Sequence, residues 1–175
     1  MTMIAGKPQV RLRALEPEDL DILYRYENDS SLWEVGTTIA PFSRKQLYDY
    51  IAGYSNDIYA ERQLRLMVDD AATGETVGTV DITDFSPADM RAQAGILIGP
   101  GHQRRGYGTA ALAAVCGYCR STLQLHQLYA HVPADNAASL ALFRQCGFRT
   151  SGRLRSWLRR GGSYRDVIVL QLLFG

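Results

Sequence analysis

Residues 96–109 read Ile-Leu-Ile-Gly-Pro-Gly-His-Gln-Arg-Arg-Gly-Tyr-Gly-Thr. In this stretch an apolar strand ends, a short polar loop follows, and a glycine-containing turn opens a helix rich in Ala and Leu. Glycine keeps side chains out of the loop, so backbone N–H groups can point into one small volume. The helix N-terminus adds a partial positive charge, and Arg104 and Arg105 add two cations beside it. The stretch therefore predicts a binding site for a phosphate or pyrophosphate.

The spacing of the glycines narrows the kind of phosphate site. It matches neither G-x-x-x-x-G-K-[ST] nor G-x-G-x-x-G, so a nucleotide triphosphatase and a dinucleotide-binding domain are both disfavoured. Taken alone, the glycine pattern is also compatible with an ordinary strand-to-helix turn. Other parts of the chain have to decide between these two interpretations.

Outward from this stretch, the hydrophobic periodicity predicts one α/β (α+β) domain over residues 1–175, with antiparallel strands first and strand–helix–strand crossovers later. A capping box between Ser43 and Gln46 opens one helix, and Asn136 caps another that stops at Gly147. The expected strands are residues 10–13, 64–68, 76–85, 91–98 and 126–132 and two segments from 148 and 164 onward; the expected helices begin near Pro17, Ser43, Gly106 and Asn136.

The composition excludes several functional classes. Hydrophobic residues make up 46% of the 175 residues and charged residues 21%, which is typical of a globular domain and not of a disordered chain. The net charge of +1 gives no footprint for wholesale binding to nucleic acid or to a membrane, and no apolar run is long enough to span one. The N-terminus lacks the pattern of a signal peptide, so we expect a cytoplasmic protein.

Cys116 and Cys119 form a C-x-x-C pair, which raises the question of a zinc or redox site. A zinc site needs a second pair of ligands, and a thioredoxin-type pair opens a helix just after a strand. Here the pair lies late in an Ala-rich helix, with Cys146 as the remaining cysteine. We therefore expect both cysteines to be small packing residues and expect no metal.

Two motifs resemble those of the GNAT acetyltransferase superfamily. Residues 103–108, Gln-Arg-Arg-Gly-Tyr-Gly, resemble its Q/R-x-x-G-x-G/A signature. Residues 136–148, Asn-Ala-Ala-Ser-Leu-Ala-Leu-Phe-Arg-Gln-Cys-Gly-Phe, resemble its second signature, which typically ends in x-x-x-G-F. The order of predicted elements matches over nearly the whole chain. The resemblance implies a GNAT-like mixed, mostly antiparallel twisted sheet of about seven strands flanked by four helices.

The resemblance further implies transfer of acetyl from acetyl-CoA, as cosubstrate, to an amine. The polar loop would hold the CoA pyrophosphate through its N–H groups, the strand before it would pair with the pantetheine arm, and the second motif would reach the arm and the nucleotide. The implied CoA contacts are Leu97, Ile98, Gln103, Arg104, Arg105, Gly106, Tyr107, Gly108, Thr109, Asn136 and Arg144.

The chain departs from the family pattern at both catalytic positions. Many members have a tyrosine at the position of Phe143 as acid for the leaving thiolate, so Ser139 is the candidate here; its alternative role is to help cap the helix. Some members use a glutamate where this chain has Gln93, which leaves Asp81 as candidate base through water, or as a group that binds a cationic substrate. Without placement, the histidines (His102, His126 and His131) are expected to be structural.

A closer resemblance within the superfamily indicates which kind of amine accepts the acetyl group. Residues 46–49, 61–64 and 162–166 resemble spermidine and diamine acetyltransferases, and the last of them is shared with the branch that acetylates ribosomal-protein N-termini. Carboxylates along a groove would suit a polyamine, with Glu34 and Asp84 as candidates, although both also fit a solvated surface. The branch also implies a homodimer or a larger homo-oligomer.

Two alternatives from other classes remain at this stage. Because Phe143 and Gln93 lack the expected catalytic groups, the chain can also be a CoA-binding sensor without catalysis. The arginines after residue 148 suggest a nucleic-acid module, but alternating basic residues more simply coat the outer face of a hairpin. We therefore expect an acetyltransferase for a polyamine or for a peptide N-terminus, with no nucleic acid or membrane partner.

Overall fold

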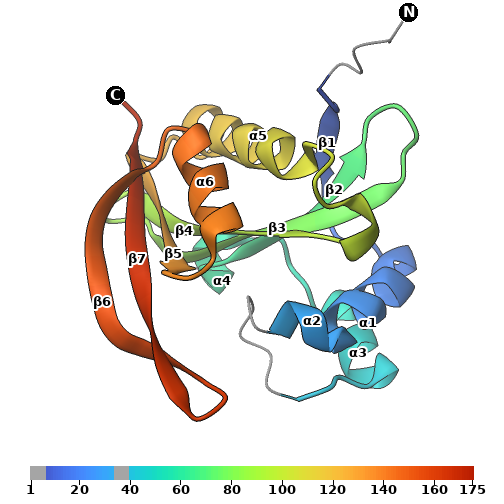
Figure 1. Ribbon diagram of the computed structural model, residues 1–175. Helices are drawn as coiled ribbons and strands as arrows, with labels where there is room; N and C mark the ends of the chain where they lie inside the picture. Colours follow the sequence, from blue (N-terminus) through green and yellow to red (C-terminus); the bar gives the residue numbers. More distant parts are fainter. Residues whose placement is uncertain (1–6, 34–39) are drawn as a thin grey trace, which may run out of the picture.

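The computed structural model describes residues 7–33 and 40–175, and within them seven strands form one sheet in the order β1-β2-β3-β4-β5-β7-β6 (Figure 1). The strands are β1 (Val10–Arg13), β2 (Leu64–Asp70), β3 (Thr76–Ser86), β4 (Arg91–Ile98), β5 (Gln127–Pro133), β6 (Arg149–Arg160) and β7 (Ser163–Leu173). The helices are α1 (Leu20–Asn28), α2 (Ser30–Trp33), α3 (Arg44–Ala52), α4 (Ile58–Glu61), α5 (Tyr107–Ser121) and α6 (Ala137–Gln145).

The predicted seven strands and four longer helices are confirmed, as is the mostly antiparallel sheet. The capping box is also present, because the Ser43 hydroxyl accepts from the N–H of Gln46 at 3.1 Å and the Gln46 side chain accepts from the N–H of Ser43 at 2.8 Å. The four-residue helices α2 and α4 were not predicted, since one helical turn is too short to show a periodicity. The helix expected from Pro17 starts as a 3₁₀ turn and becomes α-helical at Leu20.

The sheet is antiparallel at every neighbour pair except β4–β5. That parallel pair has only three matched positions, the last of which joins Gln93 to Tyr129. Beyond it the two strands part, while β4 stays paired with β3 as far as Ile98. The sheet is therefore open between β4 and β5 along half of β4.

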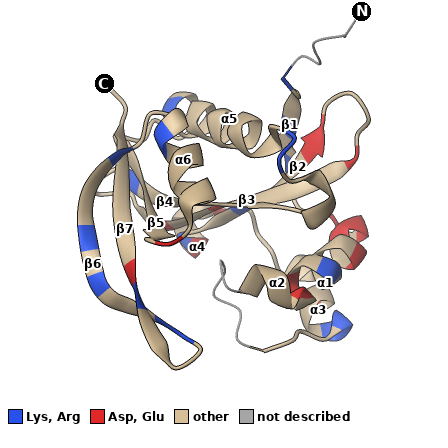
Figure 2. Cartoon of the chain, in the orientation of Figure 1, with Lys and Arg blue, Asp and Glu red and all other residues tan. Residues whose placement is uncertain are grey.

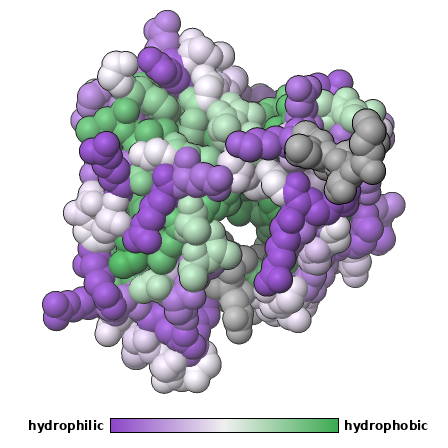
Figure 3. Space-filling model, turned by 45° about the horizontal axis from the view of Figure 1, so that its top comes forward, coloured by the Kyte–Doolittle hydropathy of each residue, from purple (hydrophilic) through white to green (hydrophobic). Residues whose placement is uncertain are grey.

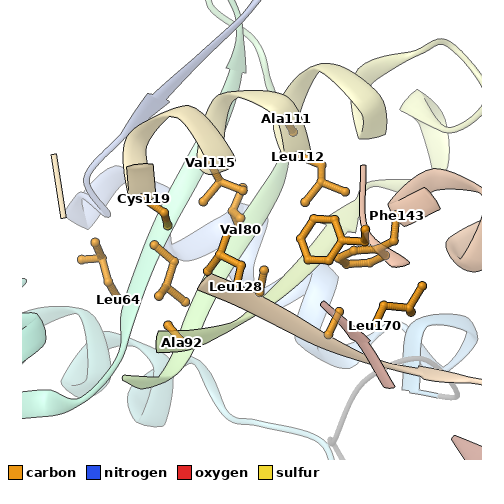
Figure 4. Packing of buried hydrophobic residues seen from close by; sticks show 14 of the residues in the cluster. Leu64, Val80, Ala92, Ala111, Leu112, Val115, Cys119, Leu128, Phe143 and Leu170 are labelled. Carbon is orange, nitrogen blue, oxygen red and sulfur yellow. The ribbon is translucent and has the colours of Figure 1, made fainter. Parts of the chain in front are cut away.

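Helices cover both faces of the sheet. Helices α5 and α6 lie on one face, and α1–α3 lie on the other (Figure 1). The larger core lies under α5, where Leu112 and Val115 pack with Val80 and Leu128 at 0% exposure (Figure 4). Each such side chain stabilises the fold by about 1.5–3 kcal/mol. A smaller cluster around Leu23 fixes the helices of the opposite face.

A buried ion network ties the N-terminal strand to the sheet. Arg13 donates to Asp19 through two nitrogens at 2.8 Å and to Asp69 through Nε at 2.7 Å. The two carboxylates are 6% and 3% exposed. The hydroxyl of Thr76 adds a hydrogen bond to Asp69 at 2.8 Å. Since a buried carboxylate is costly unless paired, this network specifies how β1 and the start of α1 dock.

The strands β6 and β7 form a long hairpin that extends beyond the helices (Figure 1). Arginines mark β6 along its length (Figure 2). Trp157 and Tyr164 are 58% and 62% exposed on the same hairpin. β6 forms the edge of the sheet, with β7 as its neighbour.

The cysteines are free, as expected for packing residues. Cys119 is fully buried on the inner face of α5, and burial raises the pKa values of Cys116 and Cys119 to about 12, so both thiols stay protonated. Within residues 7–33 and 40–175, no three His, Cys, Asp or Glu side chains are placed to hold a metal ion. In the same ranges no helix is long and apolar enough to cross a membrane.

Candidate active site

The gap between β4 and β5 opens into a cavity of about 570 Å³. Its walls are β4, the polar loop after it, the first turn of α5, the end of β5, one side of α6 and part of α2. Figure 3 shows the molecule hollowed near its centre. Along residues 94–97 none of the described strands pairs with the edge of β4 that faces this gap, so its backbone groups are available to an extended ligand. The lining residues include Leu97, Ile98, Gln103, Arg104, Gly108, Asn136, Ser139, Leu142 and Phe143.

The polar loop is shaped by residues with left-handed backbone conformations. Arg104 has φ +59° and Gly106 has φ +88°, and the Gln103 side chain donates to the Ile98 carbonyl at 3.1 Å. Gly106 is the N-cap of α5 and has no side chain to cap the first turn. The first N–H groups of α5 therefore keep their donor capacity and their partial positive charge. This arrangement fits a pyrophosphate.

Glycine also keeps the first turn of α5 narrow. A Cβ on Gly108 would lie 3.3 Å from Leu142 Cδ2, so a larger residue would push α5 and α6 apart beside the cavity. Tyr107 contributes only its backbone here, because its side chain is 5% exposed and its hydroxyl donates to Asp70. The guanidinium of Arg105 lies 5.4 Å from the Tyr107 ring centroid.

Helix α6 presents Ser139 to the cavity. Its backbone N–H is capped by Asn136 Oδ1 at 3.0 Å, while its hydroxyl has no hydrogen-bond partner among the described residues. Phe143 also lines the cavity, but the ring is 3% exposed and packs edge-on against Phe148 at 5.0 Å. Ser139 therefore carries the available hydroxyl on this side of the cavity, whereas Phe143 belongs to the core.

Another cavity, of about 360 Å³, lies toward α1–α3. It shares Gln93, Gly95, Ile96 and Leu97 of β4 and Leu32 of α2 with the first cavity, so the two spaces meet across β4. Among the described residues, Asp81 alone comes within 4 Å of a Cβ placed on Gly95, at 3.8 Å, which leaves open space at the junction. An acyl group in one cavity and a nucleophile in the other would meet at this glycine.

A chain of charges lines the second cavity. Arg65 donates to Asp81 at 2.7 and 3.1 Å and to Glu27 at 2.9 Å. Burial lowers the pKa of Arg65, but the two carboxylates raise it by more than burial lowers it. The net pKa is therefore above the usual value, and the guanidinium stays charged. The three groups sum to one negative charge, and the carboxylates are 20% and 32% exposed. The cavity can therefore accept a cation at either carboxylate.

Aromatic side chains enclose the same cavity, among them Trp33, Tyr50 and Tyr54. Tyr50 faces the Arg65 guanidinium at 5.9 Å, and burial raises the pKa of Tyr50 to about 12. The Trp33 indole donates to the Glu27 carbonyl at 2.7 Å, and the Tyr54 hydroxyl accepts from the Arg65 N–H. Neutral aromatic faces beside carboxylates suit an ammonium group.

The remaining predicted residues lie outside these walls or outside the described ranges. Asp84 ends the regular pairing of β3 and accepts a hydrogen bond from the Tyr129 hydroxyl. Arg144 is exposed and donates to Thr150 at 3.4 Å, and Thr109 donates to Gln145 at 3.4 Å. Glu34 lies outside the residues that the structure describes.

The chain resembles known proteins both in sequence and in fold. The family model of the acetyltransferase (GNAT) domain matches residues 9–149. The chain belongs to this family. It is a GNAT family N-acetyltransferase, and the family together with a CoA-bound relative implies acetyl-CoA as cosubstrate.

The relatives include spermidine N(1)-acetyltransferases. That of Vibrio cholerae is 27% identical over 94% of this chain and 93% of its own length, and that of Escherichia coli K12 is 29% identical over 91% and 83%. A Vibrio cholerae spermidine N-acetyltransferase structure with CoA and spermine matches with a TM-score of 0.84, at 27% identity over 94% and 95% of the two chains. A dodecameric structure of that enzyme matches with a TM-score of 0.77, at 28% identity over 94% of each chain.

Sequence reasoning missed the role of Arg65 in this N-acetyltransferase. The signal was present, because Arg65 stands in the apolar run Leu-Arg-Leu-Met-Val of β2, on the same face as the fully buried Met67. A charge on such a face needs a partner, and Asp81 lies directly across on β3. Without the register of β2 and β3, that pairing could not be assigned.

Proposed function

We propose that this N-acetyltransferase moves the acetyl group of acetyl-CoA to a primary amine of a polyamine such as spermidine, by direct attack in a ternary complex. The observation that carries the proposal is the junction of the two cavities at Gln93 and Gly95. One cavity fits a CoA arm and pyrophosphate, and the other has carboxylates beside aromatic rings. The names of the relatives support the same substrate class.

The protein first has to align the amine with the thioester. The amine nitrogen attacks the thioester carbonyl carbon, a C–N bond forms, and the C–S bond breaks. Ser139 is the candidate donor to the leaving sulfur, since its hydroxyl has no partner among the described residues. A thiol pKa near that of cysteine, about 8.5, also lets the thiolate leave with modest help.

In this proposal Asp81 and Glu27 bind the cationic part of the acceptor. Asp81 accepts two hydrogen bonds from the Arg65 guanidinium, and the lone pairs that remain on its 32% exposed carboxylate can accept the N–H groups of an ammonium. Asp84 and Glu34 remain candidates for contacts to the far end of a longer amine.

The proposal includes a homo-oligomer. The long β6–β7 hairpin places Trp157 and Tyr164 in solvent at its end, where a monomer gains nothing from them. The dodecamer of the Vibrio cholerae relative supports assembly through copies of the same chain. Size-exclusion chromatography with light scattering tests this part, and a monomer at micromolar concentration would contradict it.

The substrate test is acetyl-CoA-dependent thiol release across spermidine, spermine, putrescine, amino acids and peptides with free N-termini, with products identified by mass. We expect saturable turnover with the polyamines, and a higher KM for spermidine in Asp81→Asn. If the enzyme prefers peptides with a free N-terminus, the acceptor is a peptide N-terminus and not a polyamine. CoA binding without turnover of any amine would favour a sensor.

A further inference from the structure

His131 lies where β4 and β5 part. Along β5, Leu128, Ala130 and Val132 are at most 3% exposed in the core, so Tyr129 and His131 face the opposite side of the sheet. Tyr129 is the last residue paired with β4, and His131 is the next residue on that face. The imidazole therefore stands directly beyond the last strand pair and lines the larger cavity together with Gln93 and Ser139.

The neighbours of His131 come from its own strand, from β7 and from the wall of the larger cavity. Its cross-strand neighbour on β7 is Val169, which does not titrate. The Tyr129 ring lies 5.3 Å from the His131 ring, and its hydroxyl donates to Asp84. The other polar residues of the cavity wall are Ser31 on α2, Gln93 on β4, Gln103 and Arg104 in the loop, Asn136 at the N-cap of α6 and Ser139 on α6.

The ionisation state of His131 follows from this setting. Burial lowers the pKa of His131, and the charge of Asp84 raises it by less, so the net pKa is below the ordinary value of 6.5. At neutral pH the imidazole is therefore neutral and has a lone pair to accept a proton. The side chain is also exposed, which gives an accepted proton a route to solvent.

We infer that His131 is the general base of the acetyl transfer, in the place that Gln93 cannot fill. The inference rests on the proposed function. The neutral amine attacks the thioester carbon, the C–N bond forms, and the carbonyl pair moves to oxygen. His131 takes the N–H proton, the carbonyl re-forms, and the C–S bond breaks. The thiolate takes a proton from water, either directly or through Ser139, which water reprotonates. His131 then releases its proton to solvent, so amine and thioester become amide and thiol.

The test is the pH dependence of kcat/KM for spermidine in the wild type, in His131→Gln and in the matched control His126→Gln. His126 is exposed just before β5, is absent from the cavity wall, and engages neighbours through its backbone N–H and C=O. We expect His131→Gln to lower kcat by about 100-fold or more near neutral pH, the ordinary size of general-base catalysis, with an unchanged Kd for CoA. The control should behave as wild type.

The shape of the profile separates a base from a structural residue. The wild type should lose activity as the pH falls through the His131 pKa, whereas His131→Gln should lack that limb and keep only the one due to the amine. An NMR titration of the imidazole resonances, assigned by their loss in His131→Gln, should give a pKa below 6.5.

Three outcomes would overturn the inference. One is a His131→Gln profile that keeps the low-pH limb, and another is an imidazole that is protonated at neutral pH. Both leave the proposed function intact, because turnover is still present. Absence of turnover in the wild type with every amine would overturn the proposed function and this inference with it.

Discussion

Gln93 on β4 is paired with Tyr129 on β5, and this is the last matched position before the two parallel strands separate. Gln93 lines both cavities, and the gap after it opens the larger one. A parallel pair of normal length would close this gap with a hydrogen-bond ladder. The short pairing is thus the structural reason that the sheet is open at the place where we propose that the thioester binds.

Gly95 keeps the junction of the two cavities open. Gly95→Val should lower kcat/KM by about 100-fold, since a displacement of about 1 Å at the reacting atoms costs that much. The fold should tolerate it, because the nearest atom to the new Cβ is 3.8 Å away. Gly152→Val, in the edge strand β6 with no atom within 4 Å, is the matched control. Steady-state kinetics and thermal unfolding check both variants. Wild-type kcat/KM in Gly95→Val would contradict the claim that the reacting groups meet at Gly95.

Gly106 is needed at the N-terminus of α5 for its backbone. Gly106→Ala forces an L-residue into φ +88° and places a Cβ 3.1 Å from Pro8 Cδ, so the loop must shift. Gly161→Ala at the hairpin tip has φ +53° and open space, so it carries only the left-handed strain of about 1–2 kcal/mol. Calorimetry should show weaker CoA binding in the first variant alone. Equal CoA affinities in the two variants would remove this loop from the binding site.

Ser139 can be tested as an acid without disturbing its helix, because Asn136 provides the side-chain cap and Ser139 only its N–H. Ser139→Ala should lower kcat by about 100-fold, within the range of general acid catalysis, and leave the KM for acetyl-CoA unchanged. Ser151→Ala is the control, since that hydroxyl bonds the Val169 carbonyl on the distant hairpin. If kcat is unchanged in Ser139→Ala, solvent alone protonates the thiolate.

Asp69 makes stability depend on pH. Burial works to raise the pKa of Asp69, but hydrogen bonds from Arg13 and Thr76 outweigh it and hold the pKa below the usual value. Its contribution to stability is therefore full above the unfolded pKa of about 3.9 and is lost as the pH falls toward the folded pKa. Asp69→Asn should cost roughly 3 kcal/mol near pH 7, the scale for a broken buried pair.

In acid, the Asp69→Asn substitution should lower the free energy of unfolding by less than it does near pH 7. Urea unfolding at pH 7 and at pH 3 measures the difference between wild type and Asp69→Asn. The difference should shrink at the lower pH, because the Asp69 carboxyl of the unfolded wild type takes up a proton there. A difference that is equal at both values would show that the charge of Asp69 does not matter.

Much of the fold was predictable because local signals agreed with it. The capping box at Ser43, the cap at Asn136 and the left-handed stop at Gly147 are each set by residues close in sequence. The glycine loop before α5 was predictable for the same reason. The four-residue helices α2 and α4 were missed, since one helical turn is too short to show a periodicity.

The acceptor side of the site depends on contacts that sequence does not reveal. Arg65 and Glu27 are 38 positions apart, and their ion pair requires α1 to pack across β2. His131 could not be assigned a role before the end of the β4–β5 pairing was known. Alternation along β5 predicts its face, but not the gap beside it.

The most direct test of the account is acetyl-CoA consumption by the purified chain with and without spermidine, followed by mass analysis of the amine. The two meeting cavities predict saturable, amine-dependent release of CoA and a monoacetylated product. Tight CoA binding with no release above the amine-free rate, for spermidine and every other amine, would contradict catalysis at this junction.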